Sequence, residues 1–264
     1  MRLGVIADVH ANLPALEAAL GALGGLGVDA YACAGDLVGY GPQPNECVQA
    51  VERLGAATVA GNHDLIAIGE LPVDRCEHLA RRSLQWTRGA LDDATRAYLE
   101  SLPRRLEVGG GVVVAHGSLD DPQEYVLGPE QAAAQLDGLR RVHPGADILV
   151  LGHTHRALVT DGRAAGAPRA GRPVPLPGGP WVLNPGAVGQ SREARVRARF
   201  MVLDLDRREA TFHAVRYDVR RTRALLRRAG LPPGSAHLPP WRARAVLRPV
   251  TRATRSAAAR VRGR

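Results

Sequence analysis

The sequence has few of the features that mark secreted, disulfide-rich or membrane-spanning proteins. It contains only three cysteines in 264 residues, and this small, odd number argues against a disulfide framework. We find no apolar run of the length needed to cross a membrane. No basic leader or cleavage site precedes the first apolar run, residues 2–7, so we expect a cytoplasmic protein.

Lysine is absent, and all 35 basic residues are arginine. The net charge is +9, but thirteen arginines follow Asp218, after which no acidic residue occurs. Residues 1–218 hold 22 arginines and 26 acidic residues, and therefore carry a net charge of −4. The lack of lysine beside abundant alanine, arginine, glycine and proline indicates a compositional bias of the coding genome. Arginine content is thus weak evidence for a nucleic-acid partner.

The end of the chain is a basic, alanine-rich segment of low complexity. Such a tail can bind nucleic acid or an anionic membrane, but we favour a solvated, partly disordered end. We divide the chain into a body of residues 1–232 and an arginine-rich extension of residues 233–264, of which the last ~15 residues are expected to be flexible. The tail residues are Trp241, Arg242, Arg244, Arg248, Arg252, Arg255, Arg260, Arg262 and Arg264.

Five short polar clusters are the most informative feature that is present. They hold five of the nine histidines. Their mixture of imidazole, carboxylate and amide oxygen suits Mn, Fe, Zn or Co, whereas a thiolate site would need cysteines. The clusters are Asp8-Val9-His10, Gly35-Asp36, Gly61-Asn62-His63-Asp64, His116-Gly117 and Gly152-His153-Thr154-His155.

Four of these clusters follow apolar runs that predict buried strands, at residues 3–7, 30–34, 112–115 and 148–151. Open α/β sheets gather ligands at the carboxyl ends of their strands, so residues far apart in sequence can meet there. The spacing of about 30 residues between successive clusters near the start fits strand-helix-strand units. The sequence therefore predicts a metal-dependent enzyme.

Helical patterns alternate with the strands and predict one α/β domain. We expect Asn12 to cap the first helix, and Asp64 to cap the helix after the third cluster rather than bind metal. The Gly/Pro-rich residues 162–180 predict a surface loop that is a candidate rim of the site. Two strands are expected toward the end, at residues 199–205 and 210–217. The helices are expected at residues 13–23, 44–54, 75–89 and 130–142.

The order and residue types of the clusters resemble the motifs of the calcineurin-like metallophosphoesterase superfamily, whose pattern is D-x-H, GD, GNH(D/E), H and GHxH. Residues 35–47 and 184–190 are similar to its small bacterial and archaeal phosphodiesterase-type branch, and the resemblance covers about residues 1–232. It implies a four-layer α-β-β-α sandwich of two mixed sheets. The alternation of elements fits this fold, but alone would not distinguish it from a single doubly wound sheet.

The resemblance also implies two divalent metal ions, with Mn favoured and Fe, Zn, Co, Ni or Mg as alternatives. Asp8 and His10, at i and i+2 of an extended segment, point to one side and can reach one ion. Two ions about 3.5–4 Å apart need a bridging carboxylate, and Asp36 is the candidate. The implied ligands are Asp8, His10 and His155 for one ion and Asn62, His116 and His153 for the other, with Asp36 between them.

The implied reaction is hydrolysis of a small phosphoester, most of all a diester, by a hydroxide that bridges the ions, with His63 assisting the leaving group. Protein Ser/Thr phosphatases continue the GD motif as Gly-Asp-x-Val-Asp-Arg-Gly, whose Asp orients this histidine and whose Arg binds phosphate. Here Gly39 and Tyr40 occupy the positions of that Asp and Arg, which disfavours a phosphomonoesterase or protein phosphatase. A noncatalytic scaffold is the second alternative. Tyr40, Tyr125 and Arg192 are the expected substrate contacts.

Overall fold

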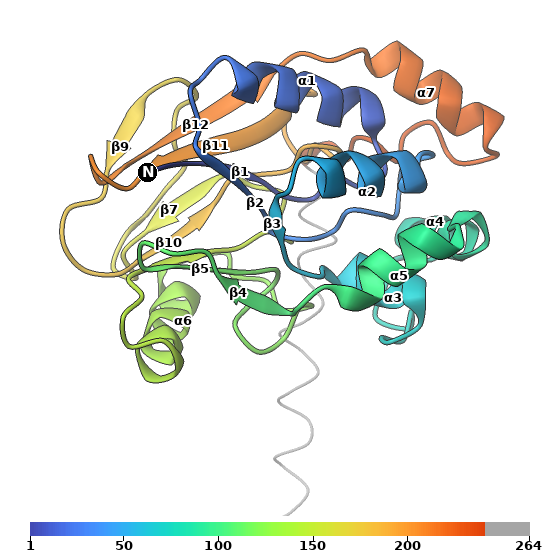
Figure 1. Ribbon diagram of the computed structural model, residues 1–264. Coiled ribbons are helices and arrows are strands. Elements are labelled where there is room, and N and C mark those ends of the chain that lie inside the picture. Colours follow the sequence, from blue (N-terminus) through green and yellow to red (C-terminus); the bar gives the residue numbers. More distant parts are fainter. Residues whose placement is uncertain (241–264) are drawn as a thin grey trace, which may run out of the picture.

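Two six-stranded sheets packed face to face form the centre of the molecule (Figure 1). The computed structural model describes residues 1–240. The strand order is β3-β2-β1-β11-β12-β9 in the first sheet and β4-β5-β6-β10-β7-β8 in the second. This arrangement confirms the expected sandwich of two mixed sheets and excludes a single doubly wound sheet.

The first sheet joins parallel strands from the start of the chain to antiparallel strands from its end. β1 runs parallel to β2, with Val5 opposite Ala32, and antiparallel to β11 on its other side. Because β1 and β2 are parallel, the segments that follow them leave the sheet at the same edge. The strands are β1 (Arg2–Ile6), β2 (Ala30–Cys33), β3 (Ala57–Thr58), β9 (Pro173–Pro175), β11 (Ala198–Asp204) and β12 (Glu209–Val215).

The second sheet has three parallel strands at its centre, because β6 pairs parallel with both β5 and β10. The segments after β5, β6 and β10 therefore leave at one edge, which is where the later polar clusters lie. Strands β5 and β6 are buried along their whole length, as expected for continuous apolar runs. The strands are β4 (Arg105–Glu107), β5 (Val112–Ala115), β6 (Ile148–Val150), β7 (Leu158–Thr160), β8 (Ala165–Gly166) and β10 (Trp181–Asn184).

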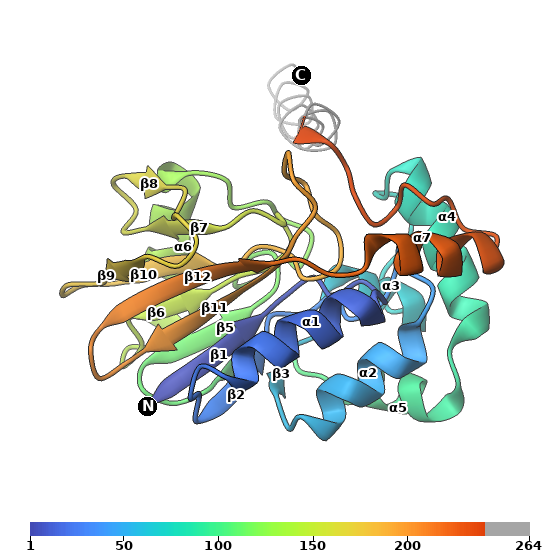
Figure 2. The same ribbon diagram turned by 90° about the horizontal axis from the view of Figure 1, so that it is seen from above.

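Helices cover the outer faces of both sheets (Figure 2). Ile6, Cys33 and Phe200 of the first sheet pack with apolar side chains of helices α1 to α5, whereas Val113 and Leu149 of the second pack against α6. Helix α7 contacts α1. The helices are α1 (Leu13–Gly24), α2 (Pro44–Arg53), α3 (Asn62–Ile68), α4 (His78–Ala90), α5 (Asp93–Ser101), α6 (Pro129–Val142) and α7 (Val219–Arg228). Within residues 1–240, none of the helices has the length and hydrophobicity of a membrane span.

The interior between the two sheets is apolar, and its side chains come from alternate positions along the strands. Leu3 and Val5 of β1 meet Val112 and Ile148 of the second sheet, and Phe212 of β12 fills the same layer. Alternate residues of each strand thus face the inter-sheet core, and the others face the helices. The polar clusters lie just beyond these buried strands, so the core fixes where each site segment begins.

Two expectations about local structure were wrong. Asn12 precedes α1, but its side chain does not cap the helix. Its amide instead donates to the Gly189 carbonyl at 2.7 Å, and its Oδ1 accepts from the Thr222 hydroxyl at 2.9 Å, because these buried partners compete with the helix N-terminus. Residues 162–180 are not all loop, since β8 and β9 lie within them. The prolines of β9 are tolerated because this strand lies at a sheet edge.

Candidate metal centre

The structure brings all seven predicted metal ligands together at the edge where the strands end. Each side chain is buried, and none is more than 6% exposed. Asp8 and His10 follow β1, Asp36 follows β2, and the remaining residues come from α3 and from the segments after β5 and β6. The predicted ligands are Asp8, His10, Asp36, Asn62, His116, His153 and His155.

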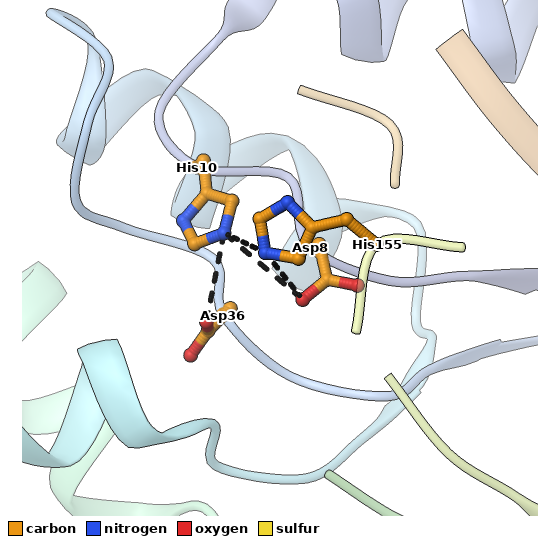
Figure 3. A group of neighbouring side chains, drawn as sticks. All are labelled: Asp8, His10, Asp36 and His155. Carbon is orange, nitrogen blue, oxygen red and sulfur yellow. Dashed lines mark hydrogen bonds and ion pairs between the residues drawn. The ribbon is translucent and has the colours of Figure 1, made fainter. Parts of the chain in front are cut away.

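One group consists of Asp8, His10, Asp36 and His155, whose ligand atoms all lie within 4.8 Å of one another (Figure 3). The Nε2 atoms of His10 and His155 are 3.1 Å apart. His10 Nε2 lies 3.5 Å from Asp36 Oδ2, and His155 Nε2 lies 3.5 Å from Asp8 Oδ1. Two imidazoles and two carboxylates thus face a common point.

A second group consists of Asp36, His116 and His153, so Asp36 belongs to both. His116 Nε2 lies 3.3 Å from Asp36 Oδ2 and 3.1 Å from the Asn62 amide oxygen. Asn62 therefore joins this group as an oxygen donor. The two groups divide the donors in the way that the sequence resemblance implies.

Three of the histidines are held by backbone carbonyl groups. A carbonyl only accepts, so each Nδ1 must carry a hydrogen, and Nε2 is the ring atom that faces the cluster, with a lone pair wherever the ring is neutral. This tautomer is the one that binds a metal through Nε2. The pairs are His10 Nδ1 with Val38 O at 3.0 Å, His116 Nδ1 with Ala34 O at 2.6 Å and His155 Nδ1 with Gln190 O at 2.9 Å.

Several buried atoms of the cluster lack a hydrogen-bond partner within residues 1–240. They are Asp8 Oδ2, Asp36 Oδ2 and His153 Nε2. Burying carboxylate oxygens and ring nitrogens without partners is costly, and divalent cations held by the two groups would satisfy all three. The residues present therefore fit a metal ion.

Burial also shifts the pKa values of the cluster toward metal-binding forms. It lowers the pKa of His10 to about 3 and holds those of His153 and His155 well below their usual value, so these rings are neutral. Burial raises the pKa of Asp8 to about 7. A buried carboxylate of this kind needs a nearby cation to stay charged at neutral pH.

His116 and Asp36 form an ion pair inside the cluster. Burial opposes charge on both side chains, but the Asp36 carboxylate raises the pKa of His116 to about 9. The positive charge on His116 in turn holds the pKa of Asp36 well below its usual value despite its burial. In the metal-free protein Asp36 is therefore a carboxylate and His116 keeps a proton on Nε2, which an ion bound at this group would displace.

Backbone strain is concentrated in the site segments. Of the eight non-glycine residues with positive φ in residues 1–240, seven belong to these segments, and Arg208 is the exception. Such conformations cost ~1–3 kcal/mol each and persist where the surrounding structure enforces them. The seven are Asp8, His10, Ala11, Asp36, Tyr40, His153 and His155.

His63 lies beside the cluster without joining either group of donors. Its backbone N–H donates to Asp36 Oδ1 at 2.8 Å. Its ring packs edge-on against His10, with centroids 4.8 Å apart, and beside Tyr40 at 4.7 Å. Its Nδ1 is buried and has no partner in the described chain, and a Cβ at Gly39 would overlap this atom. Ring packing, not a carboxylate, holds His63.

Asp64 has the capping role that the sequence predicts. Its Oδ2 accepts from the Gly61 N–H at 2.9 Å, and its Oδ1 accepts from the Val38 N–H at 3.0 Å. Asp64 thereby fixes the start of α3 to the segment after β2, so that Asn62 and His63 face the cluster.

The three expected substrate contacts surround the cluster. Tyr125 stacks on His153 with ring centroids 4.1 Å apart, and Tyr40 lies against His10 and His63. Arg192 is buried, and its Nε donates to Gln190 Oε1 at 3.2 Å. The structure thus places all three residues at the site, while their roles remain predictions.

Sequence reasoning missed the backbone groups that orient the histidines. The carbonyls of Ala34, Val38 and Gln190 perform this task, and every residue type has a carbonyl. A sequence signal existed only for Gln190, because it lies in the stretch 184–190 that carries the resemblance.

Comparison with known proteins assigns the family. The sequence model of the calcineurin-like phosphoesterase superfamily domain matches residues 1–208. The chain belongs to this superfamily. The assignment confirms the predicted family and indicates a metal-dependent phosphoester hydrolase.

Two solved structures and one curated sequence are similar to this calcineurin-like phosphoesterase over most of its length. The chain is 38% identical to a metallophosphoesterase from Sphaerobacter thermophilus, with a TM-score of 0.77 over 89% of this chain and 97% of that one. A hypothetical protein from Pyrococcus horikoshii shares the fold at 21% identity and a TM-score of 0.74, covering 89% and 96%. An uncharacterized protein of Methanocaldococcus jannaschii is 29% identical over 224 residues, 83% of this chain and 89% of the relative.

Proposed function

We propose that this calcineurin-like phosphoesterase uses two divalent metal ions and hydrolyses a phosphodiester. The observation that carries the proposal is the position of Asp36, whose carboxylate belongs to both groups of donors. Asp36 would bridge the ions, as in other dinuclear sites. Asp8, His10 and His155 would hold one ion, and Asn62, His116 and His153 the other.

Two bound ions, with Mn²⁺ as our choice for this donor set, would supply Lewis acidity and lower the pKa of a water molecule. The chain supplies the rest. Carbonyl groups hold three ligand rings in one tautomer, and strained segments fix the carboxylates. These groups are therefore arranged before substrate binds, which is the condition for electrostatic stabilisation of a transition state.

We assign His63 to the leaving group. It lies against His10 and Asp36 yet is not a metal donor, so its imidazole is available for an N–H contact with the departing oxygen. A positioned histidine of this kind contributes about 10²–10⁴-fold to a rate. Tyr40, Tyr125 and Arg192 are the proposed substrate contacts.

The residues beside His63 favour a phosphodiester over a phosphomonoester as the substrate. Gly39 leaves no space there for an orienting aspartate, and Tyr40 places a buried ring where the phosphatase motif has arginine. A second candidate is phosphomonoester hydrolysis, which Arg192 favours because its buried guanidinium can bind an additional phosphate charge.

Comparing two chromogenic substrates tests the proposal. With Mn²⁺ bound, we expect kcat/KM for bis(p-nitrophenyl) phosphate to exceed that for p-nitrophenyl phosphate by about tenfold or more, and Asp36→Asn to abolish both activities. A reversed preference would support the monoesterase. Hydrolysis of neither substrate by protein that holds metal would support a noncatalytic scaffold.

A further inference from the structure

The chain after α7 turns back across the molecule (Figure 2) and packs along the segment that follows β10. We call residues 231–238 the C-terminal strap. The Ser191 N–H donates to the Ala236 carbonyl at 3.3 Å, and the Leu238 N–H donates to the Ser191 carbonyl at 2.9 Å. Ser235 is fully buried, so the strap is part of the packed structure around the site.

Gln190 is the residue through which the strap meets the site. Its side chain is fully buried. Its Nε2 donates to the Ser235 carbonyl at 3.1 Å, and its Oε1 accepts from Arg192 Nε at 3.2 Å. Its backbone carbonyl accepts from His155 Nδ1 at 2.9 Å. Gln190 therefore contacts the strap, a buried cation and a proposed metal ligand at once.

These partners permit only one orientation of the Gln190 amide. The Ser235 carbonyl can only accept, so it must face the NH₂ group, and the Arg192 guanidinium can only donate, so it must face the oxygen. A flipped amide would place two donors together and two acceptors together. The strap thus determines which end of Gln190 meets Arg192.

Arg192 is held at Nε but has an unpartnered group inside the site. The residue is 5% exposed, and its Nη1 is buried without a hydrogen-bond partner among residues 1–240. Its positive charge lowers the pKa values of Asp8 and His155, although burial is the larger influence on both, so it lies close to the proposed ligands. An unpaired buried guanidinium nitrogen indicates an anionic ligand.

The strap also supports a second segment of the site, the one that holds Tyr40. The Ser235 hydroxyl donates to the Tyr40 carbonyl at 3.0 Å, and Tyr40 is one of the residues held at positive φ. Ser235 consequently links Gln190 and Tyr40 through its carbonyl and its hydroxyl. This link makes the strap a shared support for two segments that border the cluster.

We propose that Gln190 is a positioning residue which, supported by the C-terminal strap, holds Arg192 so that its free Nη1 binds a phosphate oxygen of the substrate. The inference rests on the proposed phosphoesterase function. Gln190 touches no reacting atom in this account. It acts by fixing the guanidinium in advance, which reduces the entropy lost when phosphate binds.

Phosphate affinity measures this role without turnover. We would titrate inorganic phosphate into Mn²⁺-loaded wild type, Gln190→Met, Arg192→Met and the double variant by calorimetry, after checking metal content. We expect each single change to weaken binding by about tenfold. The double variant should bind no more weakly than Arg192→Met, because Gln190 acts through Arg192.

Two further variants separate positioning from general damage. Gln190→Glu keeps an oxygen for Arg192 Nε but turns a second acceptor toward the Ser235 carbonyl, so it should lose the strap contact and bind phosphate more weakly than wild type. Glu193→Gln lies on the same segment but pairs with Arg199, and should leave phosphate affinity unchanged. If Gln190→Met does not fold, Gln190→Asn carries the same expectation, because its amide is too short to reach both partners.

The outcomes distinguish the inference from the function on which it rests. Wild-type affinity in Gln190→Met or Gln190→Asn, or fully additive losses in the double variant, would overturn the positioning role while leaving the phosphoesterase proposal intact. Wild-type protein that is loaded with Mn²⁺ but binds no phosphate would count against the proposed function itself, and against the inference with it.

Discussion

At the level of single residues, His63 separates metal binding from catalysis. Its ring packs against His10 and its backbone contacts Asp36, but it is not among the donors. We expect His63→Ala to retain bound metal and to lose about 10²–10⁴-fold in kcat, because only help to the leaving group is removed. Metal content and turnover of a chromogenic diester measure the two effects, with exposed His78→Ala as the control. Loss of metal in His63→Ala would contradict this assignment.

A substitution at Gly39 tests how closely the chain packs against the His63 ring. Gly39 has a φ of +83°, and a Cβ there would overlap His63 Nδ1. Gly39→Asp should therefore not recreate the phosphatase arrangement. We expect it to displace His63, lower kcat by tenfold or more and destabilise the protein by about 1–3 kcal/mol.

The control for Gly39→Asp is Gly21→Ala in α1, where a Cβ would meet nothing within 4 Å. This substitution should raise the free energy of unfolding by about 0.5–1 kcal/mol and leave kcat unchanged. Urea unfolding and steady-state kinetics give both quantities. An active, stable Gly39→Asp variant would show that the space beside His63 is larger than we describe.

Residue types explain which parts of the site the sequence predicts. Aspartate and histidine in short polar clusters predict metal ligands, and the structure brings those side chains together. The orienting carbonyls of Ala34 and Val38 have no such signature. Neither does the arrangement of Gln190, whose importance depends on a strap almost fifty residues away in sequence.

At the level of elements, Asn12 joins three segments that surround the site. Its amide donates to the Gly189 carbonyl and to the Tyr217 hydroxyl, and its oxygen accepts from Thr222 of α7. Asn12→Ala would leave buried partners unpaired. We expect it to lower the free energy of unfolding by about 2–3 kcal/mol, measured in urea.

The matched control for Asn12→Ala is Asn45→Ala, a partly exposed amide that bonds the Ala90 carbonyl. It should cost less than about 1 kcal/mol, because water can replace its partners. Equal effects of the two substitutions would show that Asn12 does not have the connecting role we assign to it.

The periodic helices and the apolar strands before the polar clusters were predicted well, whereas the two-residue strands were not. Helix α1 was expected at residues 13–23 and spans Leu13–Gly24, and α6 was expected at 130–142 and spans Pro129–Val142. Strands β3 and β8 have two residues each, too few to show an alternating pattern. The arginine-rich α7 was missed because it buries little, with Thr222 and Leu226 on its inner face.

At the level of the whole molecule, the buried cluster couples metal binding to stability. Without a cation, one oxygen of each carboxylate, Asp8 Oδ2 and Asp36 Oδ2, has no hydrogen-bond partner in the described chain. A ligand at a thousand times its Kd stabilises the folded state by about 4 kcal/mol per site. We therefore expect chelation to lower Tm by several degrees, and Mn²⁺ to restore it, as measured by calorimetry.

This metal-dependent stability should decrease as the pH falls below about 7. The pKa of Asp8 is raised to about 7 by burial in the metal-free protein, so below that pH a proton competes with the ion for its carboxylate. A Tm difference between Mn²⁺ and chelator that is zero, or that grows toward acid pH, would contradict the account.

Local sequence patterns do not predict which strands distant in the chain pair with each other. β1 and β11 are neighbours although about two hundred residues separate them, and this contact joins the start of the chain to its later half. Periodicity identifies strands but carries no information about such pairing. The resemblance supplied the two-sheet arrangement, and the structure confirms it. The proposed partition at residue 232 remains a prediction, and the arginine-rich tail after residue 240 lies outside the described residues.

The number of divalent ions bound per chain tests the central claim most directly. Protein stripped with chelator and titrated with Mn²⁺ should bind two ions at sites that Asp36→Asn weakens together, because the Asp36 carboxylate belongs to both groups of donors. Binding of no ion by the wild-type protein, or two ions held with unchanged affinity in Asp36→Asn, would contradict a dinuclear centre bridged by Asp36.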